Sequence, residues 1–187
     1  MKIALFGGAF DPPHRGHQRV ARSLVEQKIV DEVWFVPVKR HPFDKQLSAD
    51  KHRVAMLKLI IEPIFQQKIE TYELDHSQKS YSFLTLKHFQ KTFPHHSFRW
   101  VIGADNVENF SKWFKYKELL EEFPVYIYPR DRVKLTQLSR GMVWLDQVVP
   151  ITVASSDIRE KVKRKESITE LVDPEVERYI KENQLYL

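Results

Sequence analysis

The sequence contains no cysteine, which excludes disulfides, thiolate metal ligands and a cysteine nucleophile. Any metal ion must therefore use oxygen or histidine ligands, and a cation carried mainly by substrate phosphates fits that composition. Long apolar runs are absent as well, because no stretch approaches the roughly 18 apolar residues of a membrane-spanning helix. The N-terminal apolar run is too short for a signal peptide and has no small-residue cleavage site. We therefore expect a cytoplasmic location and no membrane partner.

Glycine is scarce, with five residues in 187, and no linker, repeat or low-complexity tract divides the chain. Domains commonly have about 100–200 residues, so we expect a single domain over residues 1–187. The hydrophobic content of 42% and charged content of 29% are typical of a globular protein. The formal net charge of +5 favours an anionic partner, either nucleic acid or a small polyphosphate.

Short apolar runs alternate with helical patterns along the chain. Strands are predicted at residues 2–6, 33–38, 68–72, 98–102 and 125–128. Helices are predicted to start near residues 17, 48, 80, 155 and 174, with Ser48, Ser155 or Ser156, and Asp173 as caps. This alternation predicts an α/β fold, a three-layer, doubly wound (Rossmann-like), mostly parallel sheet with helices on both faces. Such sheets bind ligands at the carboxyl ends of their strands.

The segment GGAFDPPHRGH, residues 7–17, directly follows the first predicted strand and leads into a helix. Gly7 and Gly8 leave the backbone open to a phosphate. His14 and His17 lie three residues apart near the helix N-terminus, where free N–H groups and the helix dipole attract anions. Two imidazoles placed there can donate hydrogen bonds to phosphate oxygens as charge develops on them. In this context the segment predicts a phosphate site rather than a turn with two surface histidines.

This segment resembles the GGxFDPxHxGH signature of the nucleotidyltransferase superfamily, and VASSDIR at 153–159 resembles its second signature, I-S-S-T-x-I-R. Further matches are SYS at 80–82, VIGADN at 101–106 and KWFKY at 112–116. Their order from end to end is similar to that of bacterial nicotinate (or nicotinamide) mononucleotide adenylyltransferases. The resemblance implies transfer of AMP from ATP to a pyridine mononucleotide, with release of pyrophosphate and Mg²⁺ carried by ATP.

The resemblance also implies roles for individual residues. The implied catalytic residues are His14, His17 and Arg159. The implied ATP-binding residues are Gly7, Gly8, Ala9, Phe10, Gly103, Asp105, Ser155 and Ser156, and the segment 154–187 is expected to complete this site. The implied pyridine nucleotide-binding residues are His41, Lys45, Ser80, Tyr81, Ser82, Trp113 and Arg130. From the residues alone, Asp105 reads equally well as a helix cap or a ribose ligand, and Trp113 reads first as a core residue.

The sequence departs from the family in two places that bear on function. HPF at 41–43 replaces the commoner P-P-H-K/R run, which leaves the choice between nicotinate and nicotinamide mononucleotide open. Ala154 stands where a serine is common, so one possible hydrogen bond to phosphate is missing.

Several alternatives remain at this point. Phosphopantetheine adenylyltransferases and cytidylyltransferases share the first signature, and HRGH also resembles the H-I-G-H of class I aminoacyl-tRNA synthetases, although K-M-S-K-S is absent. A non-catalytic nucleotide sensor or a nucleic-acid-binding module is a different class of protein. The basic residues are scattered rather than aligned on one helix, so we expect small-molecule substrates and no nucleic-acid partner. Whether the chain forms a homo-oligomer is left open.

Overall fold

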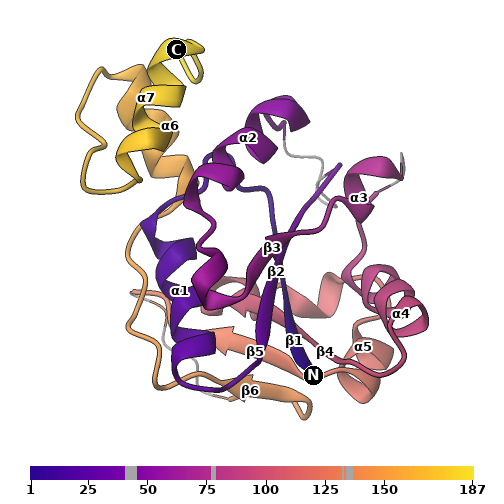
Figure 1. The fold of residues 1–187 in the computed structure, drawn as a ribbon. Coiled ribbons are helices and arrows are strands. Elements are labelled where there is room, and N and C mark those ends of the chain that lie inside the picture. The colour runs from indigo at the N-terminus through magenta and orange to yellow at the C-terminus, as the bar shows by residue number, and fades with distance from the viewer. Residues whose placement is uncertain (41–45, 77–78, 132, 134–136) are drawn as a thin grey trace.

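The computed structural model describes residues 1–40, 46–76, 79–131, 133 and 137–187 (Figure 1). Within these residues six strands form one sheet in the order β3-β2-β1-β4-β5-β6, and every pairing is parallel. The strands are β1 (Lys2–Gly8), β2 (Glu32–Pro37), β3 (Gln67–Ile69), β4 (Ser97–Gly103), β5 (Val125–Tyr128) and β6 (Met142–Trp144).

Seven α-helices accompany the sheet in the described part of the chain. They are α1 (Arg15–Glu26), α2 (Asp50–Ile60), α3 (Tyr72–Asp75), α4 (Ser82–Thr92), α5 (Tyr116–Glu122), α6 (Ser155–Lys163) and α7 (Pro174–Glu182). Short 3-10 turns occur at Pro63–Phe65, Ala104–Asn106 and Phe110–Lys112. The predicted doubly wound α/β fold is confirmed.

Side-chain alternation along the strands divides the core into two layers. In β1, Ala4 and Phe6 pack with residues of α1, α2, α6 and α7, whereas Ile3 and Leu5 pack with residues of α4 and α5. All four side chains are buried, as expected for a central parallel strand covered on both faces. Figure 1 shows α6 and α7 side by side at the end of the molecule near α2, where the C-terminus also lies.

The order of the sheet reverses direction at β1, which has β2 on one side and β4 on the other. Ligands of doubly wound sheets bind at this reversal, outside the carboxyl ends of the strands. The segment between β1 and α1 leaves the sheet at this point. The signature at residues 7–17 therefore lies where the topology itself favours a ligand.

The predicted elements are largely present, but two predicted caps are wrong. The helix expected at Ser48 starts at Asp50 with Ala49 at its N-cap, and the backbone N–H of Ser48 instead bonds to Asp11. Ala154, rather than Ser155 or Ser156, is the N-cap of α6. Asp173 does cap α7, since its carboxylate accepts the N–H of Glu175.

Arg53 of α2 is fully buried beneath the ends of two strands. Its guanidinium donates to the carbonyl of Ala9 at 2.8 Å and to the carbonyl of Val38 at 2.7 Å. It also bonds to the carbonyl of Ser48 at 3.1 Å and pairs with Asp50. One side chain thus joins the loops that follow β1 and β2 to the start of α2.

Replacing Arg53 by methionine should lower the free energy of unfolding by about 3 kcal/mol, because buried carbonyls lose their donors. Urea unfolding measures this change. Lys51→Met on the exposed side of the same helix is the matched control and should change stability by less than about 0.5 kcal/mol. Equal stabilities of the two variants would contradict this role for Arg53.

Candidate active site at the carboxyl ends of β1 and β4

The two histidines of the first signature lie at the N-terminus of α1. His14 is the N-cap residue, and its backbone N–H donates to Nδ1 of His17 at 3.1 Å. Their rings are stacked, with centroids 3.7 Å apart and planes inclined by 20°. Since Nδ1 of a neutral His17 accepts this bond, its ring proton is on Nε2, which is left as a donor.

Gly16 allows this stacking because it has no side chain. A Cβ at Gly16 would lie 2.5 Å from Cγ2 of Ile151 and 2.9 Å from Nδ1 of His14. Only a hydrogen fits between the helix start and these groups. The glycine of the HRGH sequence is therefore required by the packing of His14.

Aromatic rings fill the space beside the two glycines of β1. A Cβ at Gly7 would lie 2.1 Å from Trp100, and one at Gly8 would lie 3.0 Å from Phe10. Phe10 itself is buried and contacts the ring of His17, with centroids 5.0 Å apart. Core packing thus requires glycine at position 7 and leaves little room at position 8. A contact of their backbone with phosphate stays a prediction.

The second signature packs directly against the first. The hydroxyl of Ser155 donates to the carbonyl of Pro12 at 2.8 Å, and Nη1 of Arg159 donates to the carbonyl of Asp11 at 2.6 Å. Both donors lie on α6, about one turn apart. The hydroxyl of Ser156 bonds to Asp157 of its own helix. Two segments that are nearly 150 residues apart in the sequence therefore form one surface.

Arg130, which was predicted to bind the pyridine nucleotide, lies beside the histidine pair. Its Nη1 donates to the carbonyl of Val153 at 2.6 Å, and its Nε is 3.5 Å from the carboxylate of Asp105. The charge of Arg130 acts on both His14 and His17. The structure thus connects the start of the second signature, the loop after β4 and the histidine pair through one guanidinium.

Both imidazoles are neutral at neutral pH. Burial, with the nearby His17 and Arg130, lowers the pKa of His14 well below its ordinary value. Burial and the charge of Arg130 lower the pKa of His17 to about 3. A neutral imidazole offers one N–H, so each ring can serve as a hydrogen-bond donor without becoming a cation.

Asp105 follows β4 in the position expected for a ribose ligand. Its side chain is half-exposed. The carboxylate lies so close to Gly103 that a Cβ at that position would be only 2.4 Å away. Burial, and then the negative charge of Asp105, raises the pKa of the buried Tyr128. Asp105 is thus a fixed, accessible acceptor beside Arg130, and its contact with ribose stays a prediction.

Four residues predicted to bind the pyridine nucleotide lie at the start of α4 and in the segment after β4. They are Ser80, Tyr81, Ser82 and Trp113. The hydroxyl of Ser80 accepts the backbone N–H of Lys39 at 3.1 Å, which holds the start of α4 against the loop after β2. Tyr81 contacts Phe114 at 4.7 Å between ring centroids. One face of Trp113 stacks on Phe110 at 4.9 Å. Ser82 is the first residue of α4, whereas His41 and Lys45 lie outside the described residues.

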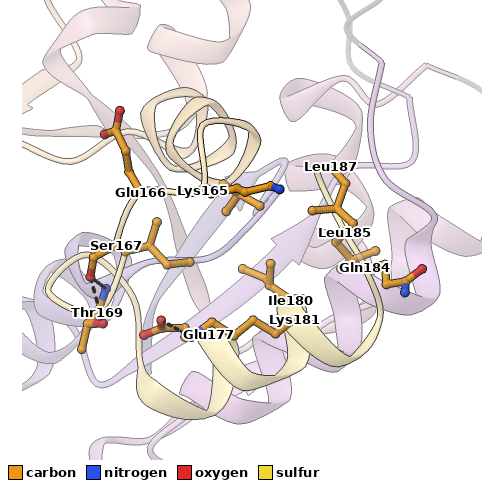
Figure 2. Close-up of a pocket in the computed structure, with 12 residues that line it drawn as sticks. Lys165, Glu166, Ser167, Thr169, Glu177, Ile180, Lys181, Gln184, Leu185 and Leu187 are labelled. Carbon is orange, nitrogen blue, oxygen red and sulfur yellow. Dashed lines mark hydrogen bonds and ion pairs between the residues drawn. The ribbon is translucent and has the colours of Figure 1, made fainter.

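The described residues contain no group of three or more histidine or acidic side chains arranged to hold a metal ion. A cavity of about 510 Å³ lies between α6, α7 and the C-terminal residues (Figure 2). None of the predicted site residues lines it. No helix in the described part of the chain is long and apolar enough to cross a membrane.

Sequence reasoning missed two groups that support this site. Arg53 carries a charge, so its residue type predicts an exposed side chain. Asp11 stands inside the signature, but its partners Ser48 and Tyr186 are 37 and 175 residues away. An arginine at a helix position otherwise facing the core was the one available signal for Arg53.

A parallel doubly wound sheet with two helix N-termini, paired histidines and an arginine at its reversal point defines a nucleotide-binding α/β protein. Residues 5–161 match the Cytidylyltransferase-like family. The chain is 37% identical to the probable nicotinate-nucleotide adenylyltransferase of Bacillus licheniformis, over 99% of this chain and 98% of that one. It is 34% identical to the nicotinate-nucleotide adenylyltransferase of Bacillus subtilis, over 99% and 98%.

The fold has a solved counterpart in Plasmodium falciparum nicotinic acid mononucleotide adenylyltransferase complexed with NaAD. The TM-score is 0.85 at 21% sequence identity, and the match covers 99% of this chain and 97% of that chain. The chain belongs to the Cytidylyltransferase-like family and, within it, to the nicotinate-nucleotide adenylyltransferases.

The lowered pKa of His17 predicts a loss of stability in acid. An unfolded histidine has a pKa of about 6.5, so below that pH His17 is protonated in the unfolded state but stays neutral in the folded state. Stability should therefore fall as the pH drops from 6.5 towards the folded pKa of about 3. Because His17 keeps partial exposure, we expect a contribution of about 1 kcal/mol per pH unit.

Urea unfolding at pH 7.5, 5.5 and 4.5 measures this effect in the wild type and in His17→Asn. The asparagine variant removes the titrating ring, so its unfolding free energy should fall less steeply with decreasing pH. Carboxylates titrate in both proteins and cancel in the comparison. Parallel pH profiles would show that His17 does not supply the difference.

Proposed function

We propose that the protein transfers the adenylyl group of ATP to nicotinate mononucleotide, forming deamido-NAD and pyrophosphate in NAD biosynthesis. The stacked His14–His17 pair, joined to Ser155 and Arg159 at the reversal point of the sheet, is the observation that carries this proposal. The names of the bacterial relatives support the acceptor. The start of α4 also supports it, since a helix N-terminus favours a carboxylate over a carboxamide.

In this reaction a phosphate oxygen of the mononucleotide attacks the α-phosphorus of ATP. The new P–O bond forms as the bond to the β-phosphate oxygen breaks, and pyrophosphate leaves in line. The attacking phosphate is already ionised, so no general base is needed. Catalysis then consists of positioning and charge stabilisation.

His17 would donate its Nε2 proton in a hydrogen bond to the phosphate oxygens on which charge develops. Nδ1 of His14 is buried against Gly16, so the other ring nitrogen, Nε2, would be the one that donates to a phosphate. The free N–H groups of Arg159 and the α6 N-terminus would hold the β/γ end of ATP. Mg²⁺ would be bound mainly by the ATP phosphates, in keeping with the cysteine-free sequence.

The other ligand groups have simple physical roles in this proposal. The backbone of residues 7–10 would approach the phosphates of ATP, and Asp105 would accept a ribose hydroxyl. Trp113 would stack its free face on the pyridine ring, an interaction favoured by the positive charge of that ring. Tyr81 and Ser82 would present the backbone N–H groups at the start of α4 to the carboxylate.

The acceptor is tested by following pyrophosphate release from ATP and Mg²⁺ with three acceptors in parallel. We expect release with nicotinate mononucleotide at a kcat/KM well above that with nicotinamide mononucleotide, and none with phosphopantetheine. Release only with phosphopantetheine would preserve the mechanism and change the product. Binding of ATP without turnover of any acceptor would instead indicate a nucleotide sensor.

Replacing His17 by alanine should lower kcat by about 10²–10³-fold, since loss of such a donor costs about 2.7–4 kcal/mol in the transition state. The KM for ATP should change much less, because the bond strengthens as charge develops. Steady-state kinetics separates the two constants. His88→Ala, which removes a histidine stacked on Tyr72 away from the site, is the control. An unchanged kcat in His17→Ala would rule out the role.

A further inference from the structure

The C-terminal segment contacts the first signature at two places. Arg15 donates to the carbonyls of Leu171 and Val172, and the last residues of the chain reach Asp11. The hydroxyl of Tyr186, the penultimate residue, donates to Oδ1 of Asp11 at 2.6 Å. The other carboxylate oxygen of Asp11 accepts the backbone N–H of Ser48 at 2.9 Å. Asp11 is buried, so these two bonds replace water around its charge.

The tail that carries Tyr186 is itself fixed. After α7 ends, the N–H of Leu185 donates to the carbonyl of Ile180 at 3.1 Å, and Leu185 packs against the core layer of α1 and α2. Burial, and then the Asp11 carboxylate, raises the pKa of Tyr186, so its hydroxyl keeps its proton and remains a donor. A neutral donor on a buried carboxylate is a strong, charge-assisted bond.

Asp11 is also the residue through which α6 holds the signature. Its carbonyl accepts Nη1 of Arg159, and the next carbonyl, of Pro12, accepts the hydroxyl of Ser155. The side chain of Asp11 thus faces the C-terminal tail and the loop before α2, while its backbone faces the arginine. A shift of Asp11 would move Arg159 and the His14 N-cap relative to each other.

We propose that Tyr186 is a positioning residue of the ATP site: its bond to Asp11 fixes the spacing between the histidine pair and Arg159. This rests on the proposed ATP site described above. Tyr186 touches no reacting atom. Its contribution is the alignment of two groups that must contact one triphosphate, and misalignment by a fraction of an ångström weakens such contacts.

The test compares Tyr186→Phe with Tyr179→Phe. Tyr179 is a matched control, because its hydroxyl also makes one bond from the C-terminal region, to His52 of α2 at 3.0 Å, without contacting the signature. Each variant loses one hydroxyl and keeps its ring. We expect the affinity of Tyr186→Phe for α,β-methylene-ATP to fall about tenfold, and its kcat/KM for ATP to fall by the same factor. Its KM for the mononucleotide should not change. Tyr179→Phe should match the wild type in both.

A double-mutant cycle with Asp11→Ala shows whether Tyr186 acts through Asp11. The Tyr186→Phe change should have little further effect on affinity for the ATP analogue once Asp11 is replaced. Additive losses, or an ATP-analogue affinity of Tyr186→Phe equal to that of the wild type, would overturn the inference. If the wild type is active with its acceptor and Tyr186→Phe behaves like the wild type, only the positioning role is refuted. Wild-type protein that does not bind the ATP analogue refutes the proposed function as well.

Discussion

The structure depends on a stretch of irregular backbone that is buried between β1 and α1. Residues 9–14 belong to no helix or strand, and Phe10 to His14 are buried. Buried carbonyls need donors, and those of residues 9, 11 and 12 receive none from a neighbouring strand or helix turn. Side chains supply them instead: Arg53 binds the carbonyl of Ala9, Arg159 that of Asp11 and Ser155 that of Pro12. The first signature keeps its shape because three side chains from two distant helices, α2 and α6, pair its backbone.

This arrangement gives the arginine and serine of the second signature a structural role before any ligand binds. Arg159 uses Nη1 for Asp11, which leaves its remaining N–H groups for the phosphate contact proposed above. The same contact orients the guanidinium, so little side-chain entropy remains to be lost on binding. Arg130 acts in a comparable way, since its bonds to Val153 and Asp105 fix a positive charge beside two histidines. A preorganised set of donors is what charge stabilisation in nucleotidyl transfer requires.

The fold could be predicted because its signals are local. Apolar runs indicated the strands β1, β2, β4 and β5, and helical periodicity indicated helices between them. The three-residue β6 and the short α5 contain too few residues to show either pattern. Local signals did not group Arg159 with His14 and His17; the family resemblance implied that grouping. The caps at Ser48 and Ser155 failed because both residues bond to the first signature across 37 and 143 residues. No local pattern encodes such a partner, and the carbonyl partners of Arg53 escaped prediction for that reason too.

The histidine pair shows how the site and its stability oppose each other. Burial, together with the charge of Arg130, lowers the pKa of both rings and keeps them neutral. The bond from the backbone N–H of His14 makes Nδ1 of His17 an acceptor and leaves Nε2 as its N–H. A histidine in water would be free to titrate and to rotate. The same burial makes protonation of the folded state unfavourable, so the protein loses free energy of folding in acid for the sake of a donor of fixed direction. The donor role proposed above accounts for packing the ring of His17 against Phe10 and that of His14 against Gly16, where solvation alone would favour exposure.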